Sequence, residues 1–85
     1  MPKLTLYHYD TCFYCVRVRR ALKRLGMTIE ERNILLDRRY RDELREATGR
    51  SRVPVLRIEH EDGRVEWMPE SLDIVAYLER YSEAS

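Results

Sequence analysis

The sequence has only two cysteines among its 85 residues, and it lacks long apolar runs, internal repeats and low-complexity linkers. Two cysteines exclude a scaffold held by several disulfides. No apolar stretch approaches the roughly 18 residues of a membrane-spanning helix, so no membrane association is expected. A chain of this length is close to the size at which one hydrophobic core suffices. We therefore expect residues 1–85 to form a single domain.

The sequence also has no large excess of positive or negative charge, because its 16 basic and 15 acidic residues give a net charge of +1. The two signs are nevertheless separated: 13 basic residues lie within residues 17–57, and eight acids lie within residues 59–85. This separation can attract an anionic ligand to one side, although the basic run over residues 17–24 is typical of a solvated helix face. The basic residues have no interleaved aromatics or reader motif, so no nucleic-acid partner is expected.

The two cysteines are three residues apart, as Cys12-Phe13-Tyr14-Cys15, where an apolar strand is followed by a helix. The free N–H groups and the positive dipole at a helix N-terminus favour the thiolate form of Cys12. Cys15, one turn later and pointing inward, would be the resolving thiol. Without a signal-like start, this spacing indicates catalytic or sensor use in a reducing compartment, and we expect a cytoplasmic protein.

Apolar periodicity and turn residues predict four strands and three helices. The strands are expected over residues 3–9, 28–34, 54–59 and 64–68. The helices are expected over residues 13–25, from Asp37 as N-cap to 48, and from 69 onward. Gly26 and Gly49 are expected to end the first two helices, and the turn at residues 61–63 predicts a hairpin.

Each predicted helix has an apolar stripe that should face the core. The stripes consist of Val18, Ala21, Leu22 and Leu25, then Tyr40, Leu44 and Ala47, and finally Leu72, Val75, Ala76 and Leu78. The order βαβαββα makes the first two strands parallel and the last two antiparallel. We therefore predict an α/β thioredoxin-like fold, with a four-stranded mixed sheet and three helices.

Three motifs on the expected elements resemble the glutaredoxin family. They are Cys-Phe-Tyr-Cys at residues 12–15, Val-Pro-Val-Leu at 53–56 and Glu-Ser-Leu-Asp-Ile at 70–74. The last two are equally similar to the N-terminal domain of glutathione transferases. The resemblance covers nearly the whole chain. It implies a dithiol, glutathione-dependent thiol-disulfide oxidoreductase that acts in redox homeostasis and electron transport, with glutathione as co-substrate and glutathionylated or disulfide-bonded proteins as partners. We expect it to act as a monomer.

The same resemblance implies roles for individual residues. Cys12 would be the nucleophile that takes the glutathionyl group, Cys15 the resolving cysteine and Tyr14 a wall of the glutathione groove. Val53, preceding a cis Pro54, would pair its backbone with the cysteinyl part of glutathione.

Glu70 and Ser71 would hold the γ-glutamyl end of glutathione. Elementary chemistry agrees, because free N–H groups at a helix N-terminus suit a carboxylate and an acidic side chain suits an ammonium group.

Some positions depart from the glutaredoxin pattern. Phe13 stands where proline is usual, and Tyr9 stands where a glutathione-binding lysine is usual. Arg52 replaces a threonine and can supply the missing positive charge, as can Arg41 or Arg45. Met68-Pro69 replaces a pair of glycines, which moves this end toward the transferase pattern.

Two other functions stay open on the sequence. One is a glutathione-binding module of transferase type with little redox turnover, and the other is a [2Fe-2S] cluster shared between two chains with glutathione as extra ligand. A zinc site is not expected, because the spacing of His8 and His60 from the cysteines matches no compact Cys₂His₂ module.

Overall fold

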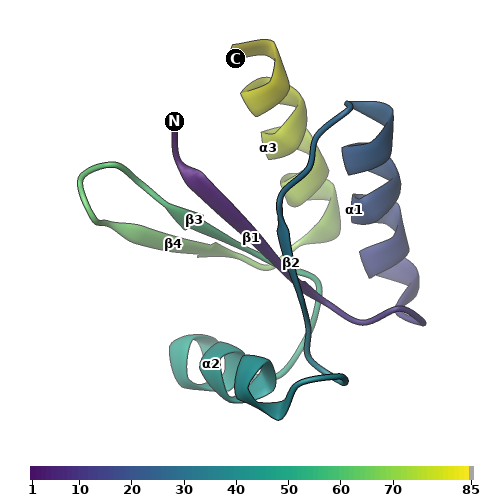
Figure 1. Cartoon of the computed structure of the whole chain (residues 1–85), viewed down its shortest axis with the longest axis vertical. Coiled ribbons are helices and arrows are strands. Elements are labelled where there is room, and N and C mark those ends of the chain that lie inside the picture. Colours follow the sequence, from purple (N-terminus) through teal and green to yellow (C-terminus); the bar gives the residue numbers. More distant parts are fainter. Residues whose placement is uncertain (85) are drawn as a thin grey trace.

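The computed structural model describes residues 1–84, which form one four-stranded sheet and three helices (Figure 1). The elements, in chain order, are β1 (Lys3–His8), α1 (Phe13–Arg24), β2 (Glu30–Asn33), α2 (Arg38–Thr48), β3 (Val55–Glu59), β4 (Val65–Met68) and α3 (Ser71–Ala84). This order and the mixed sheet confirm the predicted thioredoxin-like fold.

The sheet has the strand order β2-β1-β3-β4. β1 pairs in parallel with β2, and β3 is antiparallel to both β1 and β4. β2 begins at Glu30, two residues later than predicted, and the turn that ends α1 reaches Met27. There the Met27 N–H donates to the Leu22 carbonyl oxygen at 2.9 Å and Gly26 has a φ of 66°.

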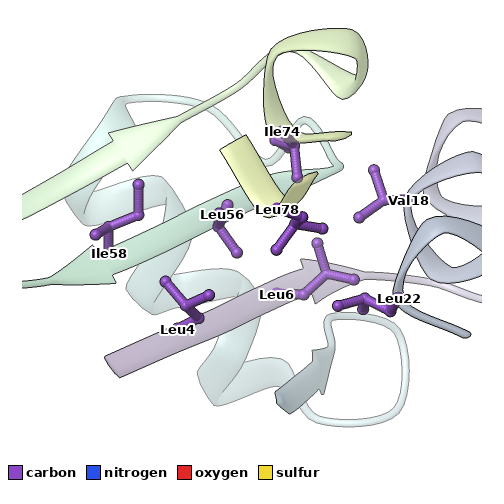
Figure 2. Packing of buried hydrophobic residues seen from close by; sticks show 8 residues of the cluster. All are labelled: Leu4, Leu6, Val18, Leu22, Leu56, Ile58, Ile74 and Leu78. Atoms are coloured by element: carbon purple, nitrogen blue, oxygen red, sulfur yellow. The ribbon is translucent and has the colours of Figure 1, made fainter. Parts of the chain in front are cut away.

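The helices lie on both faces of the sheet: α1 and α3 cover one face and α2 covers the other (Figure 1). Figure 2 shows how the larger core forms where α1 and α3 meet the sheet. Its buried members are Leu4, Leu6, Val18, Leu22, Leu56, Ile58, Ile74 and Leu78. The smaller core under α2 consists of Tyr7, Ile34, Leu44 and Val55.

A polar network holds α2 against the sheet. The Tyr7 hydroxyl on β1 donates to the Glu43 carboxylate on α2 at 2.9 Å. Arg32 on β2 donates to both groups, at 2.9 Å to Tyr7 and 2.7 Å to Glu43. Since α2 buries only Leu44, this network adds fixed contacts that hold the middle of the helix on the sheet. Gly49, in the left-handed conformation with φ 78°, ends the helix there as predicted.

Two predicted core positions are wrong. Leu72 is 67% exposed, because α3 buries Ser71, Ile74 and Leu78 instead, and Leu72 therefore points away from the sheet. Ala47 is also exposed, since it faces the open groove rather than the core under α2. Within residues 1–84, no helix combines the length and apolar character needed to cross a bilayer.

Candidate functional site

Cys12 is the N-cap of α1, in the loop that follows β1. Its backbone is extended, with φ −77° and ψ 116°, and its sulfur accepts a hydrogen bond from the Cys15 N–H at 3.3 Å. The Cys12 N–H in turn donates to the Tyr9 carbonyl oxygen at 3.2 Å. The first turn of the helix therefore directs a backbone donor at the Cys12 sulfur, as the sequence position predicts.

The two thiols are free and differ in their surroundings. Cys12 keeps 8% of its surface exposed, whereas Cys15 is fully buried. Burial, followed by a hydrogen bond to Cys12, raises the pKa of the Cys15 thiol to about 12. Cys15 is therefore protonated at neutral pH and weakly nucleophilic. Of the two residues, Cys12 is the one that keeps some exposed surface.

The loop before β3 brings Val53 and Pro54 beside Cys12. The Val53–Pro54 peptide bond is cis, as the resemblance implies. The Cys12 thiol donates to the Val53 carbonyl oxygen across 3.8 Å. Two motifs that are 41 positions apart in the sequence thus meet at one sulfur atom.

A groove of about 880 Å³ runs beside this pair of motifs. All six predicted glutathione-binding residues line it, namely Tyr14, Arg52, Val53, Pro54, Glu70 and Ser71. Cys12 is not among the lining residues found within residues 1–84, and it adjoins the groove through Val53. The fold therefore brings the predicted binding residues together in one place, while their roles stay predictions.

The sequence did not single out three other residues of the groove, Arg17, Arg50 and Trp67. Arg17 follows Tyr14 by three positions on α1, and residues three apart lie on the same side of a helix. This spacing was the signal in the sequence that could have identified Arg17. Trp67 reaches the groove from β4 and packs on Tyr7 with ring centroids 5.5 Å apart.

The groove carries more positive than negative charge. Among residues 1–84, its charged lining residues are Arg17, Arg50 and Arg52 on the positive side and Glu70 on the negative side, so it suits an anionic ligand. Arg41 and Arg45, the other positions considered for a substitute charge, do not line it among the residues described.

A metal site has little support from these side chains. The part of the chain that the structure describes holds no group of three or more histidine, cysteine or acidic residues placed to bind a metal. A shared [2Fe-2S] cluster would need ligands from a second chain and from glutathione, and it stays a hypothesis.

Comparison with known proteins identifies the family. Residues 6–85 match the family described as "Glutathione S-transferase, N-terminal domain". A search of curated proteins found no match. Many solved structures are similar, and the chain spans less than two fifths of the length of the first of them.

One similar structure is maleylacetoacetate isomerase from Anaeromyxobacter dehalogenans 2CP-1, solved with bound dicarboxyethyl glutathione and citrate. It is 31% identical with a TM-score of 0.71, over 96% of this chain and 38% of that chain. A trimeric glutathione transferase from Leishmania, TDR1, is 26% identical with a TM-score of 0.73, over 92% of this chain and 17% of that one.

A glutathione transferase homologue from Drosophila mojavensis, solved with bound glutathione, has a TM-score of 0.76 at 21% identity, over 96% of this chain and 36% of that chain. Its likeness supports the fold alone. Together with the family match over nearly the whole sequence, the fold and the order of the motifs show that this chain belongs to the glutathione S-transferase N-terminal domain family.

Proposed function

We propose that this chain binds glutathione in the groove and uses Cys12 as the nucleophile of glutathione-dependent thiol-disulfide exchange. The observation that carries this proposal is the position of the Cys12 sulfur. It lies at the N-terminus of α1, 3.8 Å from the carbonyl oxygen of a groove residue, Val53. The glutathione bound to the similar maleylacetoacetate isomerase and the chemistry of the groove support the same ligand.

The ligand would lie along the groove as a short extended peptide. Its γ-glutamyl end would contact Glu70 and Ser71, and its cysteinyl backbone would pair with Val53. Tyr14 would pack against its side, and Arg52 with Arg50 would attract the glycyl carboxylate. This direction places the cysteinyl sulfur of glutathione at Cys12.

The exchange then needs no further cofactor. The Cys12 thiolate attacks the glutathionyl sulfur of a mixed disulfide, a Cys12–glutathione disulfide forms, and the other sulfur leaves as a thiolate that takes a proton from water. A second glutathione attacks the same disulfide, which releases oxidised glutathione and restores the Cys12 thiolate. Overall, one mixed disulfide and one reduced glutathione are converted to one free thiol and one oxidised glutathione.

The environment of Cys15 favours glutathione as the resolving thiol in this cycle. A buried thiol with a pKa of about 12 must lose its proton before it can attack the Cys12 disulfide. Reduction of protein disulfides through a Cys12–Cys15 disulfide would therefore be slower than exchange of the glutathionyl group, although Cys15 has the advantage of high effective concentration.

A second candidate is a glutathione-binding module with little redox turnover. It is favoured by the 8% exposure of Cys12 and by the position of this residue beside the groove rather than in its lining. In this case the groove would bind glutathione equally well, and the loss of Cys12 would change neither binding nor turnover.

Titration of the protein with reduced glutathione, followed by amide chemical shifts, tests the binding step. We expect the largest shifts at Val53, at residues 70–72 and at Tyr14, because these line the proposed binding site and have an amide N–H. Gly63 in the hairpin turn and Leu36 in the loop before α2 are internal controls, since neither lines the groove among the residues described. Unmoved signals at Val53 and residues 70–72 at saturating glutathione would contradict the binding proposal.

A further inference from the structure

The polar attachment of α2 to the sheet depends on one side chain of the helix, Glu43. Its carboxylate accepts hydrogen bonds from the Tyr7 hydroxyl at 2.9 Å and from the Arg32 guanidinium at 2.7 Å. Arg32 also donates to the Tyr7 hydroxyl oxygen at 2.9 Å, so three hydrogen bonds connect α2, β1 and β2. Within residues 1–84, no other side chain of α2 forms a hydrogen bond to the sheet.

The apolar attachment of α2 is small, so this polar network accounts for much of its hold on the sheet. Leu44 is the one buried residue of the helix, and Tyr40 packs against the same core while partly exposed. Tyr7 is only 1% exposed, so water has little access to its hydroxyl and cannot readily replace Glu43 as acceptor. Hydrogen bonds to an ionised acceptor are also roughly twice as strong as neutral ones. Loss of the Glu43 charge should therefore loosen α2 and leave the larger core in place.

The C-terminal end of α2 forms one wall of the groove. Ala47 and Thr48 line the groove, and so does Arg50 in the loop that follows the helix. The Thr48 hydroxyl oxygen accepts from the Arg50 N–H at 3.3 Å, which ties this loop to the helix. Because a helix moves largely as one body, a displacement of its middle at Glu43 would also displace this wall.

A second connection to the groove passes through the ring of Tyr7. This ring packs on Trp67 with the centroids 5.5 Å apart, and Trp67 lines the groove from β4. Tyr7 therefore contacts Glu43 with its hydroxyl and a groove residue with its ring. Among the residues described, Tyr7, Arg32 and Glu43 do not line the groove themselves.

We propose that Glu43 is a positioning residue, which acts through Tyr7 and Arg32 to fix the groove wall formed by the C-terminal end of α2. If the wall is in place for only a fraction of the time, the apparent affinity for a ligand falls by that fraction. Affinity for glutathione would then depend on a side chain outside the binding groove. This inference rests on the proposed function, because glutathione is the ligand whose affinity reports the position of the wall.

Glu43→Gln tests this assignment, because it removes the charge and keeps the shape of the side chain. Glu46→Gln is the matched control: it makes the same chemical change on the same helix at an exposed position with no ion pair within residues 1–84. By calorimetry, the Kd for S-methylglutathione should rise about three-fold or more in Glu43→Gln. It should stay within about 1.5-fold of the wild-type value in Glu46→Gln.

Amide hydrogen exchange separates positioning of α2 from a general loss of stability. In unliganded Glu43→Gln, exchange over residues 41–48 should accelerate, while β1 and β3 keep their wild-type protection. Saturating S-methylglutathione should slow the exchange of α2 again, because a ligand that needs the wall in place favours the attached helix.

Tyr7→Phe provides a second variant, since it removes the hydroxyl and keeps the ring against Trp67. It should weaken binding in the same direction as Glu43→Gln. The double variant should lose less affinity than the two single losses predict together, because both changes remove the same hydrogen bond.

The possible failures are distinct. If wild type does not bind S-methylglutathione, the proposed function is overturned, and this inference with it. If wild type binds and Glu43→Gln matches it in both Kd and α2 exchange, only the assignment of Glu43 is overturned. Faster exchange by the same factor in α2, β1 and β3 would also contradict the assignment, because it would show a change in overall stability instead.

Discussion

Replacement of Cys12 by serine is expected to abolish glutathione-dependent reduction of hydroxyethyl disulfide, whereas Cys15→Ser should retain most of it. The alcohol cannot form the mixed disulfide through which the cycle runs. Glutathione can take the place of Cys15, which is buried and protonated at neutral pH. The measurement is the initial rate of a coupled assay with glutathione, glutathione reductase and NADPH, after subtraction of the rate without protein.

The two serine variants control for each other, since both replace a sulfur atom in the same turn of the chain. Binding of S-methylglutathione by Cys12→Ser would show that the groove is intact in the inactive protein. If wild type and Cys12→Ser bind glutathione and show equal turnover, the oxidoreductase function is excluded. The glutathione-binding module of transferase type would then be the remaining candidate. Loss of turnover on Cys15→Ser alone would show that the buried thiol is obligatory.

Leu78→Ala is expected to destabilise the fold by about 2–5 kcal/mol. Leu78 is fully buried in the core between α3, α1 and the sheet, so removal of its side chain leaves a cavity (Figure 2). Small domains have a free energy of unfolding of roughly 5–15 kcal/mol, and this loss is therefore a large fraction of the total. Urea unfolding monitored by circular dichroism gives the difference directly.

Leu72→Ala is the matched control, because it makes the same chemical change on the same helix at a position that is 67% exposed. It should alter the free energy of unfolding by no more than about 0.5 kcal/mol. A similar loss of unfolding free energy in the two variants would contradict the observed orientation of α3. It would instead support the sequence prediction that Leu72 faces the core.

The order of the elements could be predicted because each one carries its own local signal. The apolar strand of β1, the glycines that end α1 and α2, and the Asp37 N-cap act within a few residues of chain. The position of Cys12 at a helix N-terminus followed from the same local pattern. Its neighbour Val53 is remote in sequence, and was placed through the family resemblance rather than through any local signal.

Leu72 shows why the face of α3 was misjudged. Helical spacing is compatible with a core face that contains Leu72 and with one that contains Ser71 and Ile74, and apolar character alone favours the former. In the fold, α3 starts beside the groove, so its first turn directs Leu72 to the groove and Ser71 toward Arg17. Only the packing of α3 on α1 decides between the two faces.

The sequence did not single out Arg17, for a related reason. It belongs to a basic run that is typical of a solvated helix face, and four of the five basic residues in that run are indeed exposed. Its difference depends on Ser71, which is 54 positions away along the chain. Contacts of this kind arise from tertiary packing, so the sequence period cannot reveal them.

The central claim is that the sulfur of Cys12 takes up the glutathionyl group. Intact mass and peptide mapping after reaction with oxidised glutathione at neutral pH test this claim most directly. We expect Cys15→Ser to gain one glutathionyl group on Cys12, with release of one reduced glutathione. Cys12→Ser, in which only the buried Cys15 remains, should stay unmodified while folded. An equal adduct on Cys15, or no adduct on Cys12 in a protein that binds glutathione, would contradict the claim.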